Sequence, residues 1–328
     1  MREGTREAAE AIRRASSVAV CCHLNPDGDT VGTALALRLT LIRMGKDAQV
    51  FCRDKVPDLV AHLPGAETVR RFESLEARER FDLLLLVDVS DAGRLGEGVW
   101  ERMRAACVTS CQIDHHATNP YYCAVNCVDG KAPAAGIMLR ELLRELRIPL
   151  DRDLAVCLYA AIATDTGNFS FPGVTAETFR VAAELLEAGL PLADENRQLF
   201  VIQPEAQVRL TGRAIESLRI SHGGEVAVMT LSRQDFADCG ASAEHADTVV
   251  NRGLAVRGVR VAALVREENG KAKVSLRAVA PDSVSGIAVR FGGGGHAQAA
   301  GCTLDGPLAE AADRIRTALE EALDGGRQ

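Results

Sequence analysis

The chain has 328 residues, of which 47% are hydrophobic and 25% are charged, and its formal net charge is −7. A soluble globular protein with two hydrophobic cores fits these values, and no apolar run approaches the ~20 residues that a membrane-spanning helix needs. The acidic balance argues against long duplex DNA as a partner. The N-terminus has mixed charge and lacks the apolar core of a signal peptide, so we expect a cytoplasmic protein.

The first part of the chain alternates strand-like and helix-like segments. A continuous apolar run such as that in Asp82–Asp88 is typical of a central parallel strand that is buried on both faces. Strands are predicted at 18–20, 48–52, 82–88 and 107–113, and helices at 30–44, 134–147, 152–164 and 175–188. The alternation predicts an α/β fold with a doubly wound, mainly parallel sheet.

The rest of the chain has a different pattern. Residues 193–220 are polar and helical with an interruption at Gln203-Pro204, which indicates a helical linker. Strand-like segments follow at 225–231, 259–267 and 273–279, with a hairpin turn at 268–271 and a final amphipathic helix at 307–323. We therefore predict a catalytic domain at 1–192, a linker at 193–220 and a smaller α/β domain at 221–328.

The most informative segment is the loop between the first strand and the first helix. It reads Cys-His-Leu-Asn-Pro-Asp-Gly-Asp-Thr over residues 22–30 and brings His23, Asp27 and Asp29 together. Two carboxylates and an imidazole at the C-terminal edge of a strand are unfavourable unless a cation pairs with them. Open α/β sheets also bind their ligands at this edge, so the loop predicts a metal site.

Further acidic and histidine residues end other predicted core elements. Asp88 ends the apolar strand, Asp114-His115-His116 ends the next, and Asp165 ends a helix. Each alone could be a helix cap or a turn residue. Together they extend the candidate metal ligands and their neighbours to His23, Asp27, Asp29, Asp88, His115, His116 and Asp165. Mixed histidine and carboxylate ligands suit Mn²⁺, with Mg²⁺, Co²⁺ or Fe²⁺ as alternatives, and two ions ~3.5–4 Å apart would favour phosphoryl chemistry.

A second candidate site lies near the end of the chain. Four consecutive glycines, Gly292, Gly293, Gly294 and Gly295, precede His296, and their backbone can approach an anion closely. Ser275 and Arg277 are two residues apart, so they share one face of a predicted strand, and the arginine offers a planar fork for phosphate. A flexible linker loop is the alternative interpretation of the glycines.

These motifs, in their order, resemble those of the DHH phosphoesterases. The first motif is His23-x-x-x-Asp27-x-Asp29, and Val87-Asp88, Asp114-His115-His116 and Asp165 follow. The second half resembles the DHH-associated domain through Val274–Arg277 and the glycine segment up to Gly301. The chain is most similar to the subgroup of bacterial nanoRNase/PAP-phosphatase proteins. That resemblance implies hydrolysis of very short oligonucleotides and of 3′-phosphoadenosine 5′-phosphate (PAP).

The resemblance also implies individual roles. His23, Asp27 and Asp88 would hold one metal ion, and Asp29, Asp88, His115 and Asp165 would hold the other, with Asp88 as the bridge. His116 would contact a phosphate oxygen or protonate a leaving group. Asp114 would orient a histidine, or it is a simple turn residue. The substrate would be bound by seven residues of the second domain, namely Ser275, Arg277, Gly292, Gly293, Gly294, Gly295 and His296.

Several rival functions remain open at this stage. A pyrophosphatase, a RecJ-type exonuclease, a cyclic-dinucleotide phosphodiesterase and a non-catalytic nucleotide sensor share parts of the pattern. The glycine motif disfavours a pyrophosphatase. The acidic net charge disfavours an exonuclease that acts on long strands, and the full set of candidate metal ligands disfavours a non-catalytic sensor. The sequence does not decide the oligomeric state, and a homodimer stays open.

Overall fold

The computed structural model describes residues 2–325, and these form two units. The first unit ends at Ile202 and the second begins at Gln203, within the predicted linker. No helix in residues 2–325 has the length and hydrophobicity to span a bilayer. The cytoplasmic location stays a prediction.

The first unit contains a parallel sheet of six strands in the order β3-β2-β1-β4-β5-β6. Every strand pair is parallel, which confirms the predicted fold class. The strands are β1 (Ser17–Cys21), β2 (Asp47–Cys52), β3 (Arg70–Arg71), β4 (Phe81–Val87), β5 (Cys107–Asp114) and β6 (Val125–Val128). Since β1 lies between β2 and β4, the strand order reverses there, and open α/β sheets bind ligands at such a point.

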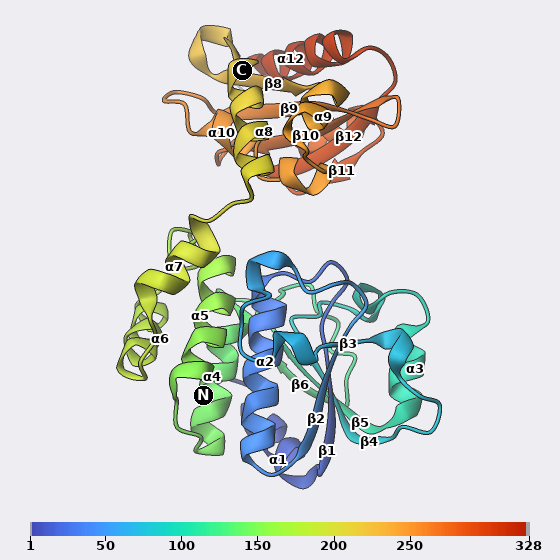
Figure 1. The fold of residues 1–328 in the computed structure, drawn as a ribbon, viewed down its shortest axis with the longest axis vertical. Helices are drawn as coiled ribbons and strands as arrows, with labels where there is room; N and C mark the ends of the chain where they lie inside the picture. Colours follow the sequence, from blue (N-terminus) through green and yellow to red (C-terminus); the bar gives the residue numbers. More distant parts are fainter. Residues whose placement is uncertain (1, 326–328) are drawn as a thin grey trace. The chain divides into compact units, whose positions relative to one another are not determined.

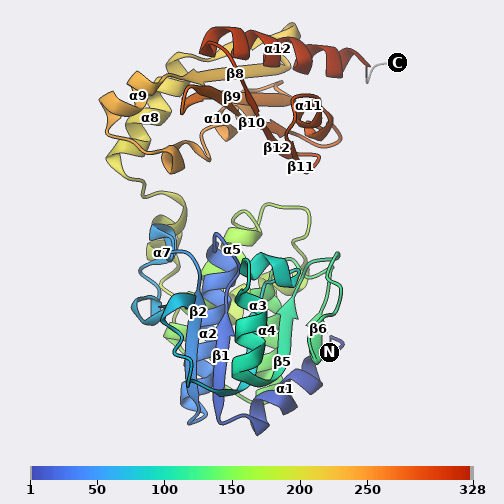
Figure 2. The same cartoon turned by 90° about the vertical axis from the view of Figure 1, so that its right-hand side faces the viewer.

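Helices cover both faces of this sheet (Figures 1 and 2). One face is covered by α2, α4 and α5 and the other by α3, and α1 packs along α4 and β6. The helices are α1 (Thr5–Arg14), α2 (Gly28–Arg43), α3 (Val99–Ala106), α4 (Ala135–Leu146), α5 (Arg152–Asp165), α6 (Ala176–Glu187) and α7 (Leu192–Phe200). Of these, α1 and α3 were not predicted from the sequence.

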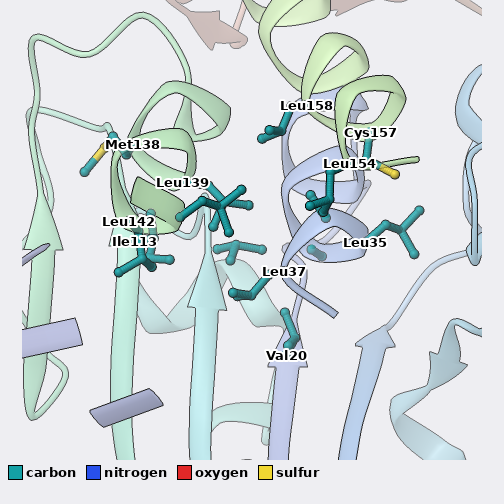
Figure 3. Close-up of a cluster of buried hydrophobic side chains, with 14 of the residues drawn as sticks. Val20, Leu35, Leu37, Ile113, Met138, Leu139, Leu142, Leu154, Cys157 and Leu158 are labelled. Atoms are coloured by element: carbon teal, nitrogen blue, oxygen red, sulfur yellow. The ribbon is translucent and has the colours of Figure 1, made fainter. Parts of the chain in front are cut away.

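The larger core of the first unit lies between the sheet and the helices α2, α4 and α5. Figure 3 shows Val20 and Ile113 from the strands facing Leu37, Leu139 and other side chains of the helices. These side chains are at most 1% exposed. The second face is also buried, which is why the strand residues 83–87 are apolar without alternation.

The second unit contains a mixed sheet of six strands in the order β11-β12-β10-β9-β8-β7. Its strands are β7 (Arg219–Ser221), β8 (Val226–Leu231), β9 (Val261–Glu268), β10 (Lys271–Ala278), β11 (Gly294–Gly295) and β12 (Ala299–Leu304). The predicted hairpin is confirmed, because β9 and β10 are antiparallel and pair Glu268 with Lys271. Asn269 and Gly270 form its turn with φ values of 52° and 76°.

Two helical layers cover the second sheet unequally. On one face, α11 (Ser285–Arg290) and α12 (Leu308–Gly325) pack against β8, β9, β10 and β12. On the other face, α8 (Glu205–Glu216) and α10 (Asn251–Leu254) pack against β8 and β9, and α9 (Arg233–Cys239) packs nearby. Ser275, Arg277 and Gly301 lie on this second face and are only partly buried.

Candidate metal centre

The carboxyl ends of three neighbouring strands bring the predicted ligands together. His23 follows β1, Asp88 follows β4, and His115 follows β5, and these strands are adjacent in the order β1-β4-β5. The remaining carboxylates come from the ends of helices α2 and α5 that lie at this edge. Asp27 and Asp29 lie at the start of α2, and Asp165 is the last residue of α5.

Asp27 is held by the helix that it precedes. It is the N-cap of α2, and its Oδ1 accepts hydrogen bonds from the backbone N–H groups of Asp29 and Thr30, each 3.1 Å long. The other oxygen, Oδ2, lies 3.7 Å from His23 Nε2. One oxygen therefore fixes the side chain while the other faces the site.

Asp29 is buried and anchored from three directions. Its Oδ2 accepts from the Ala135 N–H at 2.6 Å, and its Oδ1 accepts from the Gly136 N–H and the Thr33 hydroxyl, both at 3.0 Å. Ala135 and Gly136 begin α4, so a helix N-terminus stabilises this carboxylate. The side chain is 0% exposed, and its position is thus set by the fold.

Close packing of two helices places Asp165 beside Asp29. A Cβ on Gly28 would lie 2.3 Å from Thr164 Oγ1, and a Cβ on Gly32 would lie 2.5 Å from the Cys157 carbonyl oxygen. Glycine at both positions therefore lets α2 approach α5. Asp165 Oδ2 consequently lies 3.4 Å from His115 Nε2.

Asp88 lies between the two histidines. Its Oδ2 is 3.4 Å from His23 Nε2, and its Oδ1 is 3.2 Å from His115 Nε2. The residue is 3% exposed, and its Oδ1 has no hydrogen-bond partner among residues 2–325. Its backbone has φ 59°, a left-handed conformation that aspartate tolerates better than most residues and that aims the carboxylate along the edge.

The ring orientations of the two buried histidines direct their Nε2 atoms at the carboxylates. His23 Nδ1 lies 2.7 Å from the Leu24 carbonyl oxygen, and His115 Nδ1 lies 3.2 Å from that of Ala132. Each Nδ1 therefore carries a proton and donates it to a carbonyl. In the neutral ring the Nε2 lone pair then faces carboxylate oxygens, an arrangement that repels unless a proton or a metal ion lies between.

The pKa values show how strongly the carboxylates favour positive charge on the two histidines. Burial acts to lower the pKa of His23, but Asp27 and Asp88 outweigh it and raise the pKa to about 10. Burial is likewise outweighed at His115, where Asp88, Asp29 and Asp165 raise the pKa to about 10. Burial, with the charge of Asp88, raises the pKa of Asp165 to about 6 despite His115. A divalent cation would replace these protons, so the residues fit a metal centre.

The potential ligands form three groups, and Asp88 belongs to two of them. His23, Asp27 and Asp88 offer ligand atoms within 4.8 Å of one another, and so do Asp29, His115 and Asp165. A third such group joins Asp88, His115 and His116. Asp88 takes part in the first and third groups and also contacts His115 of the second. A carboxylate in this position can bridge two ions.

Asp114 orients His116, which is one of the two roles expected for it, and the sequence did not reveal the buried amide side chains behind Asp114. The Nδ1 of His116 lies 2.8 Å from Asp114 Oδ1, and Asp114 Oδ2 accepts from Asn119 Nδ2 at 2.6 Å. Asn119 and Gln112 exchange two further amide hydrogen bonds of 2.9 and 3.1 Å. Asp114, Gln112 and Asn119 are at most 6% exposed. The hydrogen bond that His116 Nδ1 donates to Asp114 raises the pKa of His116 above its usual value.

The predicted substrate residues lie together on the second unit. Ser275 pairs with Gly301 and Arg277 with Ala299 on the adjacent strand, and Gly294 pairs with Gly301 from the other side. Among residues 2–325, Arg277 donates a side-chain hydrogen bond only to the carbonyl oxygen of its neighbour Leu276, and burial lowers its pKa. Residues 292–298, which include His296, are exposed.

The glycines also have a packing role that the interpretation as an anion-binding loop did not foresee. A Cβ on Gly293 would lie 2.1 Å from the Gly301 carbonyl oxygen, and one on Gly295 would lie 2.6 Å from that of Ala299. The N–H groups of Gly292 and Gly293 already donate to Val289 and Ala288. Two of the glycines are therefore needed for the short strand β11 to pair with β12.

Three comparisons place these features among known proteins. The model of the DHH family N-terminal domain matches residues 17–162, and that of the DHHA1 domain matches residues 223–325. The "Bifunctional oligoribonuclease and PAP phosphatase NrnA" of Thermus thermophilus is 31% identical over 98% of this chain and 95% of its own length.

A cyclic-di-AMP phosphodiesterase of Geobacillus thermodenitrificans is 24% identical over 97% of this chain but only 49% of its own length. Among solved structures, an exopolyphosphatase-related protein from Bacteroides fragilis has a TM-score of 0.89 at 23% identity, with 97% of this chain and 96% of that chain covered. This likeness shows that the fold is shared.

Proposed function

Because the chain belongs to the DHH family, with a DHH N-terminal domain followed by a DHHA1 domain, we propose that it hydrolyses short oligonucleotides to mononucleotides and PAP to AMP. The relative from Thermus thermophilus, similar over nearly its whole length, is named for both activities. The observation that carries the proposal is the cluster of three histidines and four carboxylates at the sheet edge, in which two Nε2 atoms face carboxylate oxygens at 3.2–3.8 Å.

Two divalent ions, preferably Mn²⁺, would complete this centre. The first would be held by His23, Asp27 and Asp88, and the second by Asp29, Asp88, His115 and Asp165. Bound there, the ions would supply Lewis acidity to the phosphoryl oxygens and lower the pKa of water. Histidine with carboxylate favours Mn²⁺ over a pure oxygen-ligand ion such as Ca²⁺.

Asp88 and His116 are the residues to which we assign direct catalytic roles. Asp88 would keep the two halves of the centre in one geometry, since each of its oxygens faces a different histidine. The Nδ1 of His116 is engaged by Asp114, and its Nε2 has no hydrogen-bond partner among residues 2–325. That atom can donate a proton to the departing oxygen or a hydrogen bond to a phosphoryl oxygen.

The second unit would bind the part of the substrate that does not react. Arg277, Ser275 and the segment Gly292–His296 combine a guanidinium, a hydroxyl and accessible backbone on one face. Arg277 has no acidic partner within 4.0 Å among the described residues, which leaves its charge for a phosphate. We propose the boundaries 1–192, 193–220 and 221–328 for the catalytic domain, the linker and the substrate domain.

The two alternative functions have weaker support. The cyclic-di-AMP phosphodiesterase is matched over only half of its length. A nucleotide sensor without catalysis would have no need for seven clustered histidine and aspartate residues.

A substrate panel tests the proposal. Purified protein with Mn²⁺ or with EDTA is given a 5′-phosphorylated diadenylate, PAP, cyclic di-AMP and a 24-nucleotide RNA, and kcat/KM is compared. We expect metal-dependent turnover of the first two substrates and much slower cleavage of the 24-mer. Faster cleavage of cyclic di-AMP or of the 24-mer would contradict the assigned substrate class, and no turnover of any member would contradict the assigned activity.

A further inference from the structure

An aromatic side chain lies at the rim of the metal centre without a role in the function described so far. Phe171 belongs to the loop between α5 and α6 and is 56% exposed. A Cβ built on Gly167 would lie 2.3 Å from the ring carbon Cε1 of Phe171, so the ring packs on the backbone of Gly167. Gly167 follows Asp165 by two residues, and the Cα atoms of residues two apart are separated by at most ~7.6 Å. The ring is therefore a close neighbour of a candidate metal ligand.

Hydrogen bonds fold the loop back onto the end of α5. The backbone N–H groups of Ser170 and Phe171 both donate to the Thr166 carbonyl oxygen, at 2.9 and 3.0 Å. The N–H group of Phe169 donates to Thr166 Oγ1 at 3.1 Å. The turn that follows Asp165 thus sets the position of Phe171.

This turn contains strained backbone. Gly167, Asn168 and Phe169 have φ values of 55°, 53° and 61°, so three consecutive residues are left-handed. Left-handed backbone is unfavourable for residues other than glycine, and for a bulky phenylalanine it is an outlier. The Phe169 ring compensates by packing between Tyr159 and Phe179, with ring centroids 6.2 and 5.5 Å away. Strain of this kind persists where the surrounding structure enforces it, and it is concentrated at functional sites.

The exposed ring differs from the partly buried one two residues before it. Phe169 packs against the core between two aromatic rings, whereas Phe171 has no aromatic or cationic partner within the described part of the chain. Apolar surface is more favourable when it is removed from water, so a turn that holds a phenyl ring in solvent gains little from that ring in the free protein. A flat ligand that covers the ring would supply the missing contact.

We propose that Phe171 is the stacking surface for a nucleobase of the substrate, next to the phosphorus at the metal ligands. The inference rests on the proposed function and names how that site binds its substrate. In a short oligonucleotide a base is one sugar ring away from the scissile phosphorus, and Phe171 is one turn of the chain away from Asp165. Stacking uses the π-face that every base has, so this contact tolerates all four bases.

Abasic substrates test the stacking surface. The panel is 5′-phosphorylated diadenylate and two analogues in which one adenine or the other is replaced by hydrogen. We expect the wild-type protein to lose about fivefold to a hundredfold in kcat/KM on one of the two analogues, the scale of stacking of one base. In Phe171→Ala this ratio should fall towards one, because the variant has already lost the contact.

Further variants distinguish stacking from simple apolar burial. Phe171→Trp keeps an aromatic face and should keep the ratio, whereas Phe171→Leu keeps an apolar side chain without such a face and should lose most of it. Val108→Ala is the matched control, because Val108 is 81% exposed near the start of β5, at the other end of that strand from His115. It should keep the full ratio. Uracil in place of the affected adenine should cost less than removal of the base.

The outcomes separate this inference from the proposed function. Equal losses of Phe171→Ala on all three substrates would overturn the stacking surface, as would an unchanged ratio or a wild-type protein that cleaves both analogues as fast as diadenylate. A wild-type protein that turns over none of the three would refute the proposed function instead. Fluorescence titration of the Phe171→Trp protein with Mn²⁺ would then still decide the inference, since equal quenching by diadenylate and by an analogue without either base would contradict stacking.

Discussion

The sheet edge of the first unit and the open sheet face of the second differ in how their polar groups are held. At the edge, Asp29 and Asp88 are almost fully buried, and Asp29 has three hydrogen-bond donors from the fold. On the open face, Arg277 is half-buried and donates only to a neighbouring carbonyl, while His296 is exposed. In the proposed function, the reaction would thus take place at the more buried site and the substrate would be recognised at the more accessible one.

This difference explains which substitutions should matter most. Removal of a buried side chain that contacts several charged residues should change the positions and pKa values of all those residues. Removal of a side chain that contacts only the substrate should change substrate affinity and leave the metal centre unchanged. The following predictions test the contrast, starting with the largest expected effect.

Asp88→Ala removes the carboxylate that faces both histidines. We expect kcat/KM to fall by about three orders of magnitude or more, because both halves of the centre lose a ligand. Steady-state kinetics with saturating Mn²⁺ and circular dichroism as a check of folding provide the measurement. Near-normal turnover of a folded variant would remove Asp88 from the bridging position.

Metal affinity should depend on pH. In the metal-free protein the pKa values of His23 and His115 are about 10, so both rings are protonated at pH 7 and must lose their protons to bind metal. Affinity for Mn²⁺ should therefore rise between pH 6 and 8, by about tenfold per unit for each proton displaced. Calorimetry in buffers of different ionisation enthalpy counts these protons, and zero release would contradict the ligand assignment.

The same pKa values predict the stability of the metal-free protein. Both histidines have a folded-state pKa above the ordinary 6.5, so their contribution is complete below that pH and is lost as pH rises towards 10. Thermal melts of protein treated with EDTA should show this decline over pH 7–10. A flat profile would mean that the imidazoles are not charged in the absence of metal.

Asn119→Ala breaks the network behind His116. Residues that orient a catalytic or metal-binding group typically contribute 10–100-fold, so we expect kcat to fall by about that factor with little change in KM. If His116 protonates the leaving oxygen, a p-nitrophenyl ester, which needs no proton, should lose much less activity. An equal loss on both substrates would indicate that Asn119 only supports the fold of the loop.

Arg277→Ala should have an effect on the same scale as Asn119→Ala and should leave the metal centre intact. We expect a loss of about 1.5–3 kcal/mol in transition-state binding, mostly through KM, because one charge-assisted hydrogen bond is removed. Metal content of the variant is measured by elemental analysis. Loss of bound Mn²⁺ would show that the two units do not divide the work in this way.

The sequence predicted most of the first unit because its signals are local. The apolar run of β4 and the glycine after α2 are visible in the chain, and all seven histidine and aspartate candidates lie at one edge as the topology requires. The helix α1 was missed, although it is strongly amphipathic, because its buried residues are mostly alanine and threonine.

Other features depend on contacts between distant segments. The alternation Ser110, Gln112, Asp114 on β5 indicates a polar face, but nothing local shows that Asn119 folds back onto it. The four glycines resembled a binding loop, whereas Gly293 and Gly295 also serve the pairing with β12.

Anomalous diffraction at the manganese edge, from crystals grown with Mn²⁺, tests the metal centre most directly. The account predicts two peaks. One should lie among His23, Asp27 and Asp88, and the other among Asp29, Asp88, His115 and Asp165, with Asp88 contacting both. A single peak, or peaks only at other residues, would contradict the two-metal centre on which the proposed activity depends.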